Sequence, residues 1–104
     1  MSELYPVTGP TNEWFVYMVR CSDDSYYIGS TTDIQRRISE HNNGTGAKYT
    51  KGRRPVLLVL ESGPLNDRSM AQSIESSLKS LSHKGKENLL TLWRSREGSK
   101  STIS

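Results

Sequence analysis

The sequence predicts an α+β fold, a three-stranded antiparallel or mixed β-sheet flanked by helices in the order β-β-α-β-α-α. Segments rich in β-branched and aromatic residues at 14–21 and 26–30 indicate two strands, and an apolar run at 56–60 indicates a third. Apolar residues at helical spacing follow at about 33–42, 67–81 and 86–94. A chain of 104 residues is long enough for one hydrophobic core, so we expect a single domain.

Both ends of the chain lie outside the predicted domain. Residues 1–13 contain Pro6, Gly9 and Pro10, which resist regular structure, and are predicted to be a flexible N-terminal arm. Residues 14–94 are predicted to form the domain. Residues 95–104 are predicted to be a disordered tail.

The loop between the first two strands decides whether two tyrosines share a face of the sheet. Side chains alternate faces along a strand, and opposed residues share one. A two-residue turn at positions 23 and 24 would oppose Tyr17 to Ser30 and place Tyr27 on the other face. An odd-length loop, or one bulge, would bring both tyrosines to one face. We predict the odd loop or bulge.

The first helix is predicted to run to about residue 42. Either Thr32 and Gln35 form a capping box, or Asp33 is the N-cap itself. The glycine- and asparagine-rich segment 42–46 ends this helix, and residues 47–54 follow as a basic loop.

Helical phase distinguishes two neighbouring arginines. At about 100° per residue, Arg37 and His41 fall in the same sector as Ile34 and Ile38. Arg36 points nearly opposite. Arg37 is therefore the arginine expected beside the sheet.

The remaining elements are a third strand and two helices. The run at 56–60 lacks polar alternation, which is typical of a strand covered on both faces, and we predict it to be the central strand. The helix after Asn66 and Asp67 has an apolar face, and Glu75 lies at its border, about 40° from Ala71. That face comprises Met70, Ala71, Ile74, Leu78 and Leu81.

Composition narrows the classes of function. Lys and Arg number 14 against 11 acidic residues, giving a net charge of +3 and a pI near 9.2, which mildly favours a polyanionic partner. One cysteine excludes an internal disulfide framework, and one cysteine with two histidines cannot make a common structural zinc site. The sequence has no P-loop, so we expect no nucleotide cofactor.

The chain has no apolar run long enough to span a bilayer and no signal-peptide pattern. We expect a soluble intracellular protein without a membrane partner, in the cytoplasm, or in the nucleus if the source is viral or eukaryotic.

An ordered series of polar residues lies among these elements. Two phenols, a guanidinium, an imidazole and one carboxylate are suited to metal-assisted hydrolysis of a phosphodiester. The series is Tyr17, Tyr27, Arg37, His41 and Glu75.

The motifs carrying these residues resemble those of the GIY-YIG endonuclease superfamily, especially its small single-domain branch from bacteria and large DNA viruses. The resemblance covers roughly residues 14–92. Its motifs are Phe15-Val16-Tyr17, Tyr27-Ile28-Gly29, Arg37 eight residues after Gly29, His41 and Glu75, and residues 46–51 and 53–55 resemble a loop of the small branch. Phe15 replaces the family's first glycine, and Asn88 is a candidate for an asparagine near the domain's end.

The resemblance implies a divalent-metal-dependent DNA endonuclease using Mg²⁺ or Mn²⁺, with Glu75 as the one protein ligand. Arg37 would bind the scissile phosphate, Tyr17 would be the general base, and Tyr27 would orient water or phosphate. His41 would bind phosphate or assist proton transfer.

Each of these residues also has an ordinary structural interpretation. Glu75 could be a solvated helix carboxylate, Arg37 could lie over the core, and the tyrosines and His41 could be core residues. In the basic loop, Lys48, Lys51, Arg53 and Arg54 would contact DNA phosphates, or would simply be solvated.

Hydrolysis of DNA in repair, recombination or DNA processing, with a preference for structure or with little specificity, is the predicted function. The alternative is a nucleic-acid-binding module that keeps the fold without catalysis. The protein is expected to be a monomer or a weak homodimer.

Overall fold

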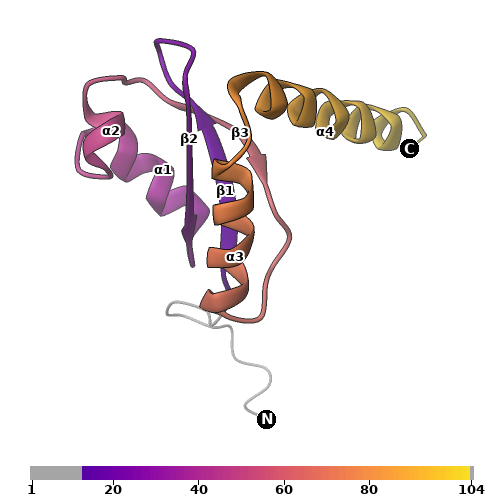
Figure 1. Cartoon of the computed structure of the whole chain (residues 1–104), viewed down its shortest axis with the longest axis horizontal. Helices are drawn as coiled ribbons and strands as arrows, with labels where there is room; N and C mark the ends of the chain where they lie inside the picture. The colour runs from indigo at the N-terminus through magenta and orange to yellow at the C-terminus, as the bar shows by residue number, and fades with distance from the viewer. Residues whose placement is uncertain (1–12, 104) are drawn as a thin grey trace.

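The computed structural model describes the backbone of residues 13–103 and the side chains of residues 13–95, and it confirms the α+β class and the order of elements. A one-turn helix, α2, is added within the predicted basic loop. The elements are β1 (Phe15–Arg20), β2 (Tyr26–Thr31), α1 (Ile34–Asn43), α2 (Lys48–Lys51), β3 (Leu57–Glu61), α3 (Arg68–Lys79) and α4 (His83–Ile103) (Figure 1).

The hairpin of β1 and β2 has the predicted parity. Tyr17 lies opposite Gly29 and Val19 lies opposite Tyr27, so both tyrosines project from one face. Cys21 N–H donates to the Ser25 carbonyl at 2.8 Å, which leaves the three-residue loop 22–24. The odd loop is confirmed.

The prediction that residues 56–60 form the central strand is wrong. The sheet order is β2-β1-β3 with all pairs antiparallel, so β1 is central and β3 lies at an edge. The register shifts between Met18 and Val19, whose partners in β3 are Leu60 and Leu58, so Val59 is an extra residue that marks a bulge in β3. Leu57 is 65% exposed. Because a bulge interrupts the alternation of faces, an apolar run can occur in an edge strand that is covered on one side only.

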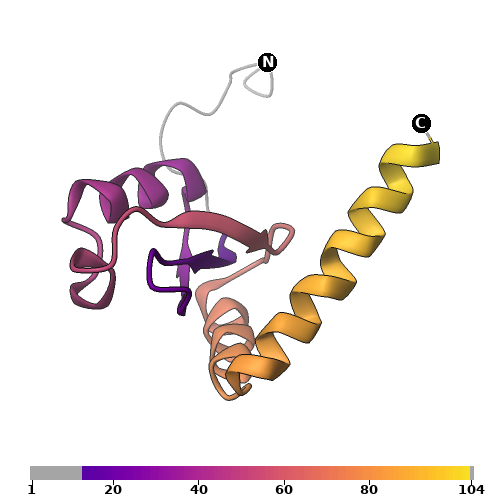
Figure 2. The same ribbon diagram turned by 90° about the horizontal axis from the view of Figure 1, so that it is seen from above.

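Helices cover the two faces of the sheet separately. Figures 1 and 2 place α1 and α2 on one side of the sheet and α3 on the other. The first face packs Tyr17, Val19, Cys21 and Val56 against α1. The second face, under α3 and the start of α4, holds a separate cluster of Val16, Met18, Ile28, Leu60, Ala71 and Leu90.

Aspartates begin the two helices that carry the candidate site residues. The Asp33 side chain accepts a hydrogen bond from Arg36 N–H, so Asp33 is the N-cap of α1, and Gly44 ends that helix with φ of 87°. Asp67 caps α3 in the same way by accepting from Met70 N–H. The predicted apolar face of α3 is only partly buried, since Met70 is 44% exposed and Leu81 lies beyond the end of the helix.

The last helix differs from the prediction in its length. It was expected at 86–94 with a disordered tail at 95–104, whereas the α4 backbone is helical from His83 to Ile103. Figure 2 shows α4 running away from the sheet. The predicted arm at 1–13 falls, apart from Glu13, outside the described residues, as does Ser104. Within the described part of the chain, none of the helices combines the length and the apolar character needed to cross a membrane.

Replacing Asp33 by Ala is expected to lower the free energy of unfolding by about 1 kcal/mol, because it removes the side-chain cap of α1. Urea denaturation followed by circular dichroism measures the change. Asp33→Asn, which keeps a capping oxygen, is the control and should lose much less. Equal losses in both variants would contradict the capping role.

Candidate active site

A chain of buried hydrogen bonds joins β1, α1 and α2. Tyr17 on β1 lies 2.7 Å from Nε2 of His41 on α1, and Nδ1 of His41 lies 2.8 Å from the Thr50 hydroxyl on α2. The Thr50 hydroxyl in turn donates to the Ala47 carbonyl at 3.1 Å. All three side chains are at most 1% exposed, so these polar groups must satisfy one another.

This chain of hydrogen bonds assigns the tautomer of His41. Because the one hydroxyl proton of Thr50 goes to the Ala47 carbonyl, its oxygen accepts from His41 Nδ1–H. Nε2 is then unprotonated and accepts from the Tyr17 hydroxyl. His41 is placed as the acceptor of the phenolic proton.

Arg37 lies on the other side of the same phenol. Its Nε donates to the Tyr17 hydroxyl oxygen at 3.4 Å, and its terminal nitrogens contact Glu40 at 2.9 Å and the Gly46 carbonyl at 3.2 Å. Tyr17 therefore accepts from a cation and donates to a base. Arg36, one residue earlier, is 54% exposed and pairs only with Glu40 among the described residues, as the helical phase predicted.

Burial and charge shift the pKa values of these three groups. Burial is the main cause that raises the Tyr17 pKa to about 12, although the hydrogen bond from Arg37 opposes it. Burial, and then the positive charge of Arg37, lower the pKa of His41, so its imidazole is neutral near pH 7. Burial disfavours the charged form of Arg37, but hydrogen bonds to Tyr17 and Glu40 outweigh it and raise its pKa.

Two glycines make the close packing around Tyr17 and His41 possible. A Cβ at Gly29 would lie 2.6 Å from the Tyr17 hydroxyl, so the phenol lies directly over the backbone of β2. A Cβ at Gly46 would lie 2.6 Å from Nδ1 of His41. Neither position has room for a larger residue.

Aromatic rings extend this site towards the surface. The Tyr27 ring centroid lies 5.2 Å from that of His41 and 6.0 Å from that of Tyr49, on which it stacks. The Arg53 guanidinium covers the Tyr49 ring at 3.9 Å. A shallow hollow of about 230 Å³ adjoins Tyr27; its lining residues are Tyr26, Tyr27, Ile28, Tyr49, Lys79 and Lys86.

Glu75 reaches the same strand from the other face of the sheet. One carboxylate oxygen accepts from the Ser30 hydroxyl at 2.9 Å, and the other lies 2.7 Å from the Lys79 ammonium. Ser30 follows Gly29 in β2, and the negative charge of Glu75 is close enough to contribute to raising the Tyr17 pKa. The five predicted residues therefore gather around the edge strand β2, with Glu75 on the α3 side.

The oxygen chemistry at Glu75 fits a hard divalent cation. Mg²⁺ and Mn²⁺ prefer carboxylate, water and phosphate oxygens, and one carboxylate can suffice when the substrate supplies the rest. The described residues include no group of three or more His, Cys, Asp or Glu side chains that could hold a metal by themselves. At 19% exposure the Glu75 side chain is within reach of a cation from solvent.

The predicted DNA-contacting cations have different surroundings. Lys48 and Lys51 are exposed on α2, next to Tyr49 and Thr50. Arg53 is held by Asp23 at 3.0 Å and by the Tyr49 carbonyl at 2.8 Å, and Arg54 Nε donates to the Lys51 carbonyl at 2.8 Å. Of these four predicted DNA contacts, the two arginines are therefore held by partners within the protein, whereas the two lysines are exposed on α2.

Sequence reasoning assigned no role to several residues of this site: Ser30, Glu40, Gly46, Thr50 and Lys79. Helical ion-pair spacing was the available signal for Lys79, at i,i+4 from Glu75, and for Glu40, at i,i+3 from Arg37. Gly46 and Thr50 lie in the loop 46–51 that contributed to the family resemblance, but no individual role was predicted for them. Thr50 reaches His41 only because α2 packs on α1. Asn88 is exposed on α4, and the structure records no contact of its side chain with the site residues.

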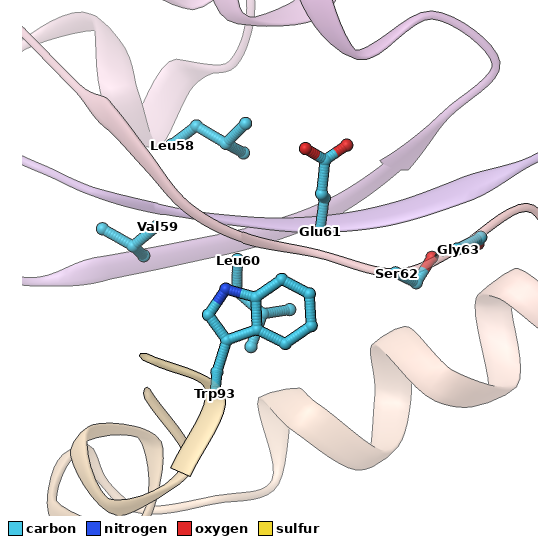
Figure 3. Close-up of a pocket in the computed structure, with 7 residues that line it drawn as sticks. All are labelled: Leu58, Val59, Leu60, Glu61, Ser62, Gly63 and Trp93. Carbon is cyan, nitrogen blue, oxygen red and sulfur yellow. Dashed lines mark hydrogen bonds between the residues drawn. The ribbon is translucent and has the colours of Figure 1, made fainter. Parts of the chain in front are cut away.

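A second hollow, at the edge strand β3, lacks the groups needed for catalysis. It is about 430 Å³, and Figure 3 shows Trp93 and Leu60 on one side of β3 while Glu61 points away on the other. Among the residues whose side chains are described, Glu61 is the only ionisable one that lines it. The candidate site is therefore the cluster around β2.

Comparison with known proteins shows the family to which this domain is similar. The family model of the GIY-YIG catalytic domain matches residues 13–88. A UPF0213 protein of Listeria innocua is 49% identical over 80 residues, which cover 77% of this chain and 88% of that protein. A UPF0213 protein of Halobacterium salinarum is 50% identical over 74 residues, or 71% of this chain and 95% of the relative.

Two solved solution structures share the fold. A UPF0213 protein of Bacillus halodurans is 42% identical with a TM-score of 0.50, and the match covers 77% of this chain and 84% of that one. A protein of E. faecalis is 37% identical with a TM-score of 0.55, over 81% and 88% of the two chains. These matches confirm the predicted fold and the predicted family.

Stability is expected to fall as the pH rises from 10 to 12, because Tyr17 ionises near 10 in the unfolded chain and near 12 when folded. Tyr17 therefore loses its proton at a lower pH in the unfolded chain than in the folded protein, which favours unfolding. For a pKa raised to about 12, the free energy of unfolding falls by roughly 2–3 kcal/mol over this range. Urea unfolding at successive pH values measures it, and subtracting the profile of Tyr17→Phe isolates the phenol from other groups. Parallel profiles for the two proteins would contradict the assignment.

Proposed function

The chain belongs to the GIY-YIG family, and on this basis we propose that it is a divalent-metal-dependent endonuclease that hydrolyses DNA phosphodiester bonds. The observation that carries the proposal is the hydrogen-bonded series Arg37, Tyr17 and His41 beside a carboxylate, Glu75, at the edge of β2. It combines a phosphate-binding cation, a proton acceptor and a metal ligand in one site.

Tyr17 and His41 together supply the general base. A phenol with a pKa of about 12 is a poor base at neutral pH unless its proton has a ready acceptor. The unprotonated Nε2 of His41 is that acceptor, at 2.7 Å, and Thr50 holds the ring in the required tautomer. Because His41 is fully buried, proton transfer fits its position better than contact with phosphate.

Arg37 binds the scissile phosphate. A guanidinium offers paired donors to phosphate oxygens and remains charged throughout. Tyr17 is 1% exposed, so the side chains around its hydroxyl have to move before water reaches it. The Tyr17 contact is the longest that Arg37 makes, at 3.4 Å, and is the one most easily exchanged for phosphate.

Glu75 holds the metal, with Mg²⁺ or Mn²⁺ as the ions that suit one carboxylate plus phosphate and water. The bound ion would polarise the phosphate and stabilise negative charge that develops during hydrolysis. Ser30 orients the carboxylate through its hydroxyl, and the half-buried Tyr27 orients water or phosphate from its hollow.

Lys48 and Lys51 bind DNA phosphates beside this site. Such contacts are weakened by salt and do not recognise the base sequence. We therefore propose a preference for DNA structure, or little specificity, and a setting in DNA repair, recombination or processing.

Glu75→Gln and Arg37→Ala are each expected to lower the rate of DNA cleavage about 100-fold or more, because each removes charge stabilisation at the phosphate. Cleavage of plasmid, linear and branched DNA is measured with Mg²⁺, with Mn²⁺ and with chelator. Arg36→Ala is the matched control, since it removes a neighbouring exposed arginine that pairs with Glu40, whereas Arg37 is the arginine that contacts Tyr17.

Full activity of Glu75→Gln and Arg37→Ala would refute the assigned site. DNA binding with no metal-dependent cleavage of any substrate would instead favour a non-catalytic binding module.

A further inference from the structure

The carboxylate assigned to the metal already holds a cation. Lys79 follows Glu75 by one helical turn of α3, and its ammonium lies 2.7 Å from Oε2 of Glu75. The other oxygen, Oε1, accepts from Ser30 at 2.9 Å. Both oxygens are therefore engaged before a divalent ion arrives.

A divalent ion and the Lys79 ammonium compete for the same negatively charged group, the Glu75 carboxylate. The Lys79 side chain is 53% exposed and the Glu75 side chain 19% exposed, so the ion pair lies at the surface and its disruption is inexpensive. A nearby ammonium also repels an incoming cation through its charge. Both effects lower the affinity of Glu75 for metal while no substrate is bound.

Lys79 lies between the Glu75 carboxylate and the hollow beside Tyr27, called here the tyrosine hollow. It lines a hollow of about 260 Å³ with Glu75, Gln72 and Ser76, and it also lines the hollow of Tyr26, Tyr27 and Tyr49. A side chain released from Glu75 remains next to the place where a phosphate would approach Tyr27. An ammonium there has a new anionic partner as soon as DNA is present.

We infer that Lys79 is a built-in counterion of Glu75 that a divalent metal displaces and that then pairs with a phosphate of the bound DNA. This exchange couples metal binding to substrate binding, and it rests on the proposed function of Glu75 as metal ligand. The Lys79 ammonium keeps an anionic partner throughout, because it exchanges the Glu75 carboxylate for a DNA phosphate. Metal held without DNA leaves the ammonium unpaired, which disfavours that state.

Replacing Lys79 by Met is expected to tighten Mn²⁺ binding to the DNA-free protein about fivefold, the size expected for a surface ion pair. Binding is followed by the paramagnetic broadening of the Ser30 and Glu75 amide signals in ¹H–¹⁵N spectra. The same spectra show that the variant is folded. Lys79→Arg keeps the cation and should bind Mn²⁺ like the unaltered protein.

Lys86→Met is the matched control. Lys86 lines the tyrosine hollow with Lys79, but among the described residues it has no ion pair with Glu75. Its removal lowers the net charge equally, so its Mn²⁺ affinity should change less than twofold. Equal tightening in the Lys79 and Lys86 variants would overturn the counterion role and leave only general electrostatics.

Two further results separate this inference from the proposed function. If Glu75→Gln leaves the broadening at Ser30 unchanged, Glu75 is not the metal ligand and both proposals fail. If Glu75→Gln abolishes it but Lys79→Met binds Mn²⁺ like the unaltered protein, the metal ligand stands and the inference is overturned.

At saturating Mn²⁺, Lys79→Met should raise the KM for DNA about threefold through the lost phosphate contact, and an unchanged KM would refute the second half of the exchange.

Discussion

The hydrogen bond between Tyr17 and His41 is the interaction on which this site depends. Neither polar group reaches water, so each must find its partner inside the protein. This requirement sets how closely α1 approaches β1 and brings Thr50 of α2 to the imidazole. It also excludes side chains at Gly29 and Gly46, where a Cβ would collide with the phenol or the imidazole. One buried pair thus orders the sheet and two helices together.

Two consecutive residues of β2 connect the two faces of the sheet. Gly29 lies under the phenol of Tyr17 on the α1 face, and Ser30 holds Glu75 on the α3 face. Because β2 is an edge strand, groups from both faces can meet beside it without crossing the packed core. The Tyr17–His41 pair and the Glu75 carboxylate are thereby close in space, but different elements hold them, α1 and α2 on one face and α3 on the other. This separation explains how a small domain can hold a buried phenol next to a carboxylate that solvent reaches.

Periodicity predicted the local features well and the sheet order poorly. The hairpin parity that brings Tyr17 and Tyr27 together, and the helical phase that separates Arg37 from Arg36, follow from geometry within neighbouring segments. The position of residues 56–60 in the sheet could not be predicted in this way, because an apolar run is compatible both with a central strand and with a bulged edge strand. Strand order depends on pairings between segments far apart in the chain. The C-terminal helix was likewise underestimated, since its length is not marked by a periodic apolar face.

The sequence by itself determined the fold class, the family and the residue types of the site, because alternation, helical spacing and motif order are properties of the chain alone. It could not supply the partners of those residues. That Thr50 holds His41, that Ser30 and Lys79 hold Glu75, and that Tyr17 is buried with a raised pKa were decided by tertiary packing. Hydrogen bonds and desolvation depend on distances of a few ångströms between segments remote in sequence, and only the folded chain sets those distances.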